Sequence, residues 1–162
     1  MEGTKGRKAA DAAMDQMISF SVGTEQYGVD IRKVREVILP GEITPLPRAP
    51  DFVKGMINLR GDVIPVIDLR EKLGRAGGGR PGEDRIIVVE ISEKLIGMIV
   101  DAVSHVLRVA PGQLEPTPPW LGGLTGEYIT GVVRQTGGLI VVLNVDTILT
   151  SGEKLALENM TR

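Results

Sequence analysis

The sequence predicts a mainly β fold, built as two five-stranded β-barrels in a pseudo-repeat, and three observations support this. Val and Ile number 33 against 15 Leu among the 162 residues, and β-branched side chains favour strands over helices. The 21 glycines and 10 prolines divide the chain into short segments joined by turns. The pattern of the first half also recurs in the second half. Because short strands in an open sheet leave their edges exposed, we expect each half to close into a barrel.

The repeat consists of two blocks that recur in the same order. Their offsets are 69 and 76 residues, and the matched ranges are 27–38 with 96–107 and 55–64 with 131–140. Within the first block one glycine and two valines correspond: Gly28 with Gly97, Val34 with Val103, and Val37 with Val106. We expect both glycines to be structural, at positions where only glycine permits the backbone angles or the close packing. Two similar barrels, each with a thin core, would pack against one another.

The chain divides into a folded region and a tail at each end. Residues 1–16 are small and polar without a period, so we expect a flexible N-terminal tail. The folded region spans 17–150, with barrel halves at about 17–74 and 86–150. The Gly-rich, apolar-poor stretch 75–85 is expected to be a flexible connector between these halves.

Local signals predict short helices and one edge strand. Residues 69–73 have the pattern of a short helix between the two halves. The C-terminal tail, 151–162, carries a further helix that we expect at 153–160. Pro65 has no N–H to donate to a neighbouring strand, so we expect the strand at 63–67 to lie at a sheet edge.

Composition excludes several classes of function. The chain has no cysteine, one histidine, five aromatic residues and a formal net charge of −2. Without cysteine or a second histidine we expect no disulfide, no metal site and no cofactor. A pair of barrels that binds nucleic acid is the alternative function, but it requires a basic face. The neutral charge balance and the scarce aromatic residues argue against that face.

A catalytic triad is suggested by His105, which follows Ser104 and lies near Asp101. Neighbouring residues on a strand point to opposite faces, so Ser104 and His105 would not meet at hydrogen-bond distance. No other set of acid, base and nucleophile stands out. We therefore expect no catalytic residue and no enzymatic activity.

The sequence shows no export or membrane signal. Its longest apolar runs are far shorter than a membrane span. The first sixteen residues lack the apolar core of a signal peptide. We therefore expect a cytoplasmic protein without direct membrane insertion.

Surfaces, rather than a catalytic site, are the candidate functional features. Arg60 lies at a predicted hairpin tip, where its charge is expected to be free to pair with a partner's carboxylate. The corresponding valines of the two halves permit two interpretations. They line a groove between the barrels, or they are core between the barrels, and composition favours core for at least half of them: Val34, Val37, Val103 and Val106.

Four sequence blocks carry a resemblance to a known family. They are 27–37, 47–61, 63–70 and 96–103. The second contains Asn58-Leu59-Arg60-Gly61 between a Pro-rich loop and a strand that ends in Asp-Leu-Arg, which is a specific combination. With these blocks the chain resembles the CheW family, the coupling proteins of bacterial chemotaxis, from about residue 18 to residue 149.

The resemblance implies a fold, a function and partners. The fold is a pair of five-stranded barrels of the Src-homology-3 type, which the repeat predicts independently. The implied function is that of a non-catalytic adaptor linking methyl-accepting chemoreceptors to the histidine kinase CheA, whose regulatory domain has the same fold in this family. The adaptor would be cytoplasmic and recruited to membrane-associated receptor arrays. The chain has no room for a kinase core or a receiver domain, which fits a separate coupling protein.

The resemblance also implies a receptor-facing groove. Carried over by position, its residues are Val34, Glu36, Asn58, Arg60, Val103 and Val106. Asn58 and Gly61 would shape the hairpin that presents Arg60. A partner helix in such a groove would use apolar anchors for affinity and flanking charges for register. Three positions depart from the family pattern or are peculiar to this chain, and they concern the choice of partner: Pro45, His105 and Trp120.

Overall fold

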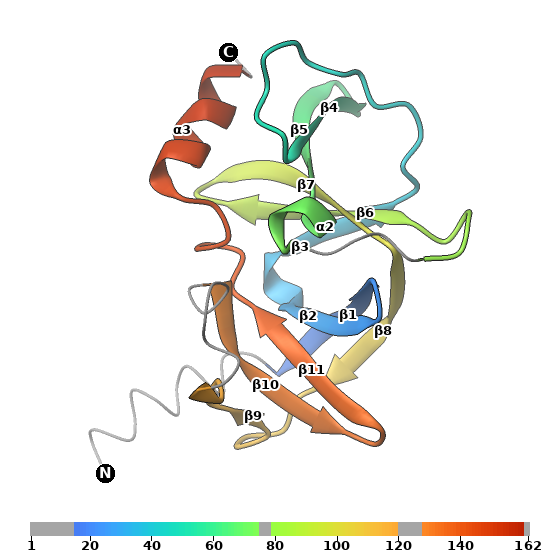
Figure 1. Cartoon of the computed structure of the whole chain (residues 1–162), viewed down its shortest axis with the longest axis vertical. Coiled ribbons are helices and arrows are strands. Elements are labelled where there is room, and N and C mark those ends of the chain that lie inside the picture. Colours follow the sequence, from blue (N-terminus) through green and yellow to red (C-terminus); the bar gives the residue numbers. More distant parts are fainter. Residues whose placement is uncertain (1–14, 75–78, 120–127, 161–162) are drawn as a thin grey trace.

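The structure, a computed structural model of the whole chain, describes residues 15–74, 79–119 and 128–160. It confirms the mainly β fold, because two sheets contain most of the described residues and the helices are short. The sheets lie one above the other along the long axis of the molecule (Figure 1). Trp120, much of the N-terminal tail and part of the connector, 75–78, lie outside the described residues.

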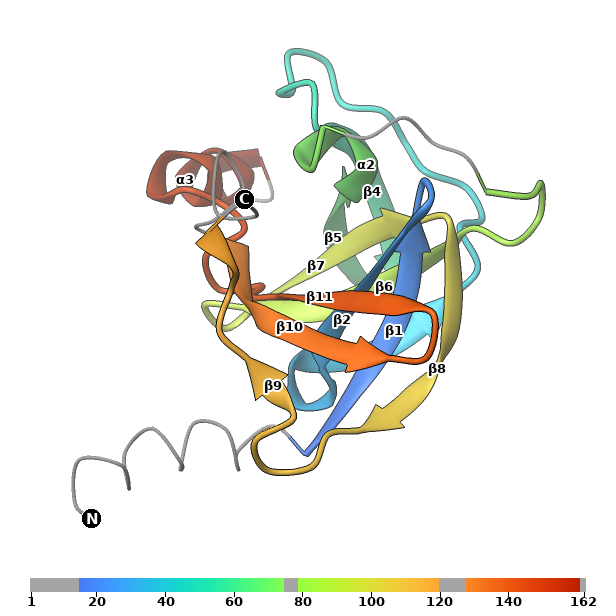
Figure 2. The ribbon, with the colours of Figure 1, turned by 60° about the horizontal axis from the view of Figure 1, so that its bottom comes forward.

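The first sheet, called sheet A, has six strands. In spatial order they are β8 (Ala102–Arg108), β1 (Gln16–Val22), β2 (Glu25–Asp30), β11 (Gly138–Leu143), β10 (Ile129–Gln135) and β9 (Leu114–Glu115). Figure 2 shows β10, β11, β2, β1 and β8 following one another across this sheet. Neighbouring strands are antiparallel except for β11 and β2, which are parallel. Gln16, expected in the tail, is the first residue of β1.

The second sheet, called sheet B, has five strands. In spatial order they are β3 (Val34–Ile38), β6 (Arg85–Ile91), β7 (Lys94–Val100), β5 (Asp62–Asp68) and β4 (Val53–Leu59). The single parallel pair is β5 and β7. Because β5 lies between β7 and β4, the expectation that Pro65 marks an edge strand is wrong. Its pairing with β7 begins only at Val66, so the missing N–H lies just outside that ladder.

The two sheets do not correspond to the contiguous halves 17–74 and 86–150. Strands β1 and β2 stay in sheet A, whereas the rest of the first half, β3 to β5, joins β6 and β7 of the second half in sheet B. The strands from β8 onward return to sheet A. Each half therefore contributes to both sheets. Hydrophobic alternation shows which faces of a strand are buried, but it does not show which other strand pairs with it.

The repeat itself is visible in the strand register. Gly28 lies beside Val142 where β2 and β11 run parallel, and Gly97 lies beside Val66 where β7 and β5 run parallel. In the second block, register shifts fall at corresponding residues, Gly55 on β4 and Gly131 on β10. An added Cβ would lie 2.1 Å from a backbone oxygen at Gly55 and 2.4 Å from one at Gly131. The internal repeat is therefore structural, although its two copies exchange strands.

Within the described part of the chain, three apolar clusters hold the fold together. One lies on a face of sheet B and includes Ile38 of β3 and Ile57 of β4, together with residues from the three other strands. A second lies on a face of sheet A, around Ile140. The largest contains residues of both sheets, such as Phe20 and Met98, and forms the core between them. Apolar burial on both faces of a sheet is the main source of stability for strands this short.

Both edge strands of sheet B contribute to one cluster, so this sheet is strongly curled. Among the described residues, no strand pairing joins β3 to β4 or β8 to β9. Closure of the two sheets into barrels stays a prediction.

Two α-helices complete the described fold. Helix α2 (Leu69–Lys72) follows β5, close to the position predicted for the short internal helix. Helix α3 (Ser151–Met160) forms the expected terminal helix and begins two residues earlier than predicted. It lies beside sheet B (Figure 1). Over the described residues, no helix has the length and apolar character needed to cross a membrane.

Candidate functional site

The hairpin between β4 and β5 presents Arg60. Arg60 and Gly61 both have positive φ angles, 52° and 92°, as a tight two-residue hairpin turn requires. The side-chain oxygen of Asn58 accepts a hydrogen bond from the Gly61 amide at 2.9 Å. This hydrogen bond stabilises the turn that the sequence motif predicts. Asparagine side chains commonly accept such bonds from the backbone of turns.

The sequence suggested an arginine without an intrachain partner, but Arg60 is paired within the chain. Its Nη2 atom donates to both carboxylate oxygens of Glu36 on β3, each at 2.7 Å. The hydrogen bond to Glu36 raises the pKa of Arg60. Arg60 is exposed and Glu36 is half-buried. The contact joins the β4–β5 turn to β3, so it brings together the two opposite edges of curled sheet B.

A matched pair of β-bulges explains where Val34 and Val103 point. On β3 the register skips Arg35, and on β8 it skips Ser104, the corresponding residue of the repeat. Each bulge shifts the side-chain alternation by one residue. As a result Val34 and Val103 both pack against the cluster between the sheets. Both valines are therefore largely core, one from each sheet.

The exposed valines also correspond in the repeat. Val106 of β8 is 49% exposed and Val37 of β3 is 36% exposed. Val106 is among the receptor-facing residues that the resemblance implies, whereas Val37, its repeat partner, was left open between groove and core. Three further exposed apolar residues were not predicted: Leu39, Val63 and Leu155. Alternation alone gave no signal for the first two, because it does not show which face of a strand another sheet covers.

The predicted groove residues form two groups. Glu36, Asn58 and Arg60 are brought together on sheet B through the hairpin and its ion pair. Val106 lies on sheet A, together with Val103. Val34 and Val103 connect the groups only through their shared packing against the core. Gly28 and Gly97 lie within their sheets, buried, and serve close packing rather than a surface.

A buried ion cluster lies where the chain passes from sheet B to sheet A. Arg70 of α2 contacts the carboxylates of Asp68 and Asp101. Burial favours a raised pKa at Asp68, but the hydrogen bonds and charge of Arg70 outweigh it, so the pKa of Asp68 is lowered. The hydrogen bond to Asp68 in turn raises the pKa of Arg70. Sequence reasoning missed this cluster, because Asp101 lies 31 residues from Arg70 in the chain.

Helix α3 is anchored through a nearly buried lysine. Lys72 donates to both oxygens of Glu153, at 2.6 and 2.7 Å. Its ammonium also lies 5.2 Å from the ring centre of Phe52 and 5.6 Å from that of Tyr128, within the range of cation–π contacts. Glu153 and Thr150 form a reciprocal capping box. Burial favours a raised pKa at Glu153, but Lys72 outweighs it and the pKa of Glu153 is lowered.

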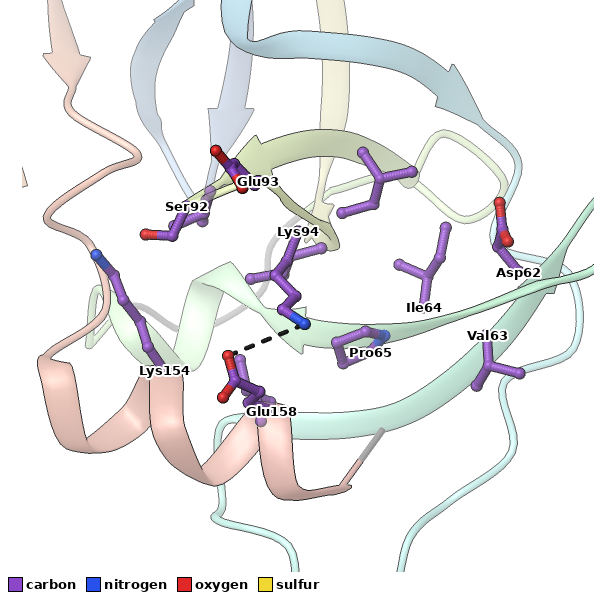
Figure 3. A pocket seen from close by; sticks show the side chains of 13 residues that line it. Asp62, Val63, Ile64, Pro65, Ser92, Glu93, Lys94, Lys154 and Glu158 are labelled. Atoms are coloured by element: carbon purple, nitrogen blue, oxygen red, sulfur yellow. Dashed lines mark ion pairs between the residues drawn. The ribbon is translucent and has the colours of Figure 1, made fainter. Parts of the chain in front are cut away.

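A shallow pocket of about 360 Å³ lies between α3, β5 and β7. Figure 3 shows Lys94 reaching toward Glu158 of α3, with Val63 and Pro65 of β5 along the pocket. The Lys94 and Glu158 charges are 3.9 Å apart. The pocket is bordered by apolar side chains and exposed charges, which suit a contact surface.

The three residues weighed as a triad lie in different surroundings. The Asp101 carboxylate accepts from the Gly23 amide at 2.6 Å and from Arg70 at 3.2 Å. Ser104 and His105 are adjacent and exposed on β8. Within the described ranges there is also no group of three or more His, Cys, Asp or Glu side chains placed to hold a metal ion.

Together these features define the class of protein to which the chain belongs. The chain is a small two-sheet β protein whose notable surface features are an ion-paired hairpin, exposed valines and a shallow apolar pocket. A family model described as the CheW-like domain matches residues 16–153. The chain belongs to this CheW-like family.

Proteins from several bacteria are similar in sequence to this chain over nearly their whole length. The "Chemotaxis protein CheW" of Klebsiella aerogenes is 31% identical over 159 residues, covering 98% of this chain and 96% of the relative. The protein of the same name from Thermotoga maritima is 34% identical, covering 86% of this chain and 91% of the relative. A crystal structure of the scaffolding protein TtCheW from Thermoanaerobacter tengcongensis superposes with a TM-score of 0.78 at 34% identity, covering 86% and 94% of the two chains.

Proposed function

We propose that this chain is a non-catalytic adaptor that couples methyl-accepting chemoreceptors to the histidine kinase CheA. The coarser part of this function, a chemotaxis adaptor, follows from the family and from relatives named as chemotaxis and scaffolding proteins. The finer part, the identity of the two partners, comes from the family resemblance. In this proposal the protein works in the cytoplasm and is recruited to receptor arrays at the membrane.

The observation that carries the proposal is the Arg60–Glu36 pair. A double contact to one carboxylate restricts the guanidinium, so its remaining N–H groups keep a defined direction. The tight turn held by Asn58 removes the freedom that a longer loop would have. Arg60 is therefore a directed, exposed charge with donors still available to an acceptor on a partner.

The receptor would supply a helix with apolar and polar positions on one face. Its apolar side chains would contact Val37 and Val106, the exposed valines of β3 and β8. A polar acceptor would meet Arg60. Exposed apolar anchors beside an oriented charge are the usual elements of helix-in-groove recognition. Val34 and Val103 support this surface from the core side.

Co-sedimentation tests the proposal. Receptor-containing membranes are mixed with wild type, with Arg60→Ala and with Arg134→Ala, each with and without CheA. Arg134 is a matched control, because it is also an exposed arginine paired with a glutamate, Glu115, at 2.8 Å on the other sheet. We expect wild type and Arg134→Ala to pellet and recruit the kinase.

Arg60→Ala should pellet poorly while its melting temperature is unchanged, because an exposed ion pair contributes little to stability. If Arg60→Ala lowers the melting temperature by several degrees, the pair is structural. Folded wild type that binds neither receptor membranes nor CheA would refute the adaptor function.

A further inference from the structure

We propose that Asp68, Arg70 and Asp101, here called the inter-sheet brace, position β8 against sheet B and so set the arrangement of the receptor-facing surface. The positioning of β8 is inferred from contacts within this chain alone. The consequence for receptors rests on the proposed function. The two parts are tested by separate measurements.

The brace has well-defined geometry. The Nε and Nη2 atoms of Arg70 donate to the two oxygens of Asp68 at 2.9 and 3.0 Å, as parallel bonds. Its Nη1 atom donates to Asp101 at 3.2 Å. Lys54 adds a longer contact to Asp68 at 3.6 Å. A planar guanidinium that bridges two carboxylates fixes both distance and direction, which a point charge does not.

Asp101 is the residue at which the chain leaves sheet B. It lies between the end of β7 and the start of β8. Its other carboxylate oxygen accepts from the Gly23 amide in the β1–β2 turn, and its own amide donates to the Ser21 carbonyl at 3.0 Å. The Asp101 side chain therefore contacts the β1–β2 turn of sheet A through Gly23, and it contacts helix α2, which follows β5 of sheet B, through Arg70. No apolar side chain could make these two directional contacts.

Burial indicates that the brace serves geometry more than stability. Asp68 is 3% exposed and Asp101 is 2% exposed. Removing carboxylates from water costs free energy, and the attraction within a buried ion pair often only just compensates for this cost. Apolar residues of similar size would give a fold at least as stable. The directional bonds are what an apolar replacement would lose. This difference is a reason for a buried ion cluster at the junction of two sheets.

The position of β8 bears directly on the proposed receptor surface. Val103 follows Asp101 by two residues and packs into the core between the sheets. The bulge at Ser104 comes next, and it places Val106 on the same face of β8 as Val103, opposite Ile18 of β1, where Val106 is 49% exposed. A change in how β8 leaves Asp101 therefore moves Val106 relative to Arg60, which is held on sheet B.

Spin-label distances measure this arrangement directly. The chain contains no cysteine, so cysteines introduced at exposed Val63 of β5 and exposed His105 of β8 are labelled uniquely. The distance distribution between them is compared in the Arg70→Lys and Asp101→Asn backgrounds. Asp146→Asn is the matched control, since Asp146 is the repeat counterpart of Arg70 but pairs at the surface with Lys33.

We expect Arg70→Lys and Asp101→Asn to broaden or shift the distance distribution under conditions where circular dichroism shows a folded protein. Asp146→Asn should leave it as in wild type. Without the spin labels, the two brace variants should bind receptor membranes roughly five- to tenfold more weakly, the size of a modest coupling between sites. Lys is the mild replacement, because it keeps the charge and loses only the planar fork.

A residue that merely stabilises the fold would lower the melting temperature and leave distances in the folded protein unchanged. Brace variants that melt lower but show the wild-type distribution therefore overturn the positioning role. A changed distribution with full receptor binding overturns the link to the receptor surface. Failure of wild type itself to bind receptor membranes refutes the proposed function and leaves the distance measurement as an independent test of the brace.

Discussion

The chain passes from one sheet to the other at two corresponding places, and the ion pairs at these two places differ in burial. At the β7–β8 passage, Arg70 and Asp101 meet with side chains that are 25% and 2% exposed. The β2–β3 passage is a short 3₁₀ helix (Ile31–Lys33). There the Lys33 ammonium lies 2.9 Å from a carboxylate oxygen of Asp146, and the two side chains are 42% and 45% exposed. The repeat places Arg70 and Asp146 at the same position, with opposite charge.

The local backbone chemistry of the two passages is nevertheless shared. Asp68 and Asn144 correspond in the repeat, and each accepts a hydrogen bond at 3.0 Å from the amide two residues later. The comparison shows that the two copies of the repeat keep the same hydrogen bond in the turn. The contribution of each ion pair to the free energy of unfolding depends instead on how deeply the pair is buried. Removing one partner from a buried pair is strongly destabilising, whereas removing one from an exposed pair costs little because water screens the charges.

The largest effect is expected from breaking the buried passage. Asp101→Ala leaves Arg70 with one fewer carboxylate and the Gly23 amide without this acceptor. Loss of one partner from a buried ion pair costs about 3–5 kcal/mol. For a chain of this size the melting temperature should fall by roughly 6–20 °C. Thermal unfolding followed by circular dichroism measures this, and a fall no larger than that of an exposed variant would contradict it.

The repeat glycines extend the comparison to the interiors of the sheets. An added Cβ at Gly97 would lie 2.7 Å from Ile86 Cγ2, and one at Gly28 would lie 2.6 Å from Met17 Sδ. Because methionine is flexible and isoleucine is stiff, Gly97→Ala should destabilise by about 1–3 kcal/mol and Gly28→Ala by less. Urea unfolding of both variants gives the order. Equal, near-zero effects would show that neither position requires glycine.

Low pH should reduce the stability that Asp68 contributes at the β7–β8 passage. The folded-state pKa of Asp68 lies below its ordinary value of 3.8. Its contribution to stability is therefore complete above the ordinary value and is lost as the pH falls through the folded pKa. Urea unfolding at about pH 5 and about pH 3 should show a smaller acid loss in Asp68→Asn than in wild type. Glu153, whose pKa is also lowered, contributes to the loss in both proteins. Identical acid losses would exclude a role for Asp68.

The smallest effect is expected at the exposed passage. Lys33→Ala and Asp146→Ala each remove a solvent-exposed pair. Such pairs contribute about 0.2–1 kcal/mol, so the melting temperature should change by less than about 4 °C. The same scans used for Asp101→Ala provide the measurement. A loss as large as that of Asp101→Ala would remove the contrast between the two passages.

Much of the fold could be predicted, because its signals are local. β-branched runs between Gly- and Pro-rich turns predicted most of the strands, and the capping pattern at Thr150 and Glu153 marks the start of the terminal helix. The Asn58–Gly61 turn depends on four consecutive residues. The assignment of contiguous halves to separate sheets was wrong, because strand partners are chosen by contacts across the whole chain.

The candidate site was predictable only as a set of residues. The family motif placed Arg60 and Glu36 in one group, but the expectation of a free arginine was wrong, since their contact crosses 24 residues of sequence. Two bulges place Val34 and Val37 on one face of β3, and Val103 and Val106 on one face of β8. Within each pair, packing covers the first valine and leaves the second exposed. A bulge changes the alternation by one residue, and nothing in a run of valines marks it.

The β class, the repeat, the turn chemistry and the family resemblance can all be inferred from the amino-acid sequence, because each depends on residue type and short spacing. The exchange of strands, the Arg60–Glu36 contact and the burial of Asp68 and Asp101 are visible only in the folded chain. These features arise when segments distant in the chain pack together. The free energy of a charge or a valine then depends on which neighbours exclude water from it.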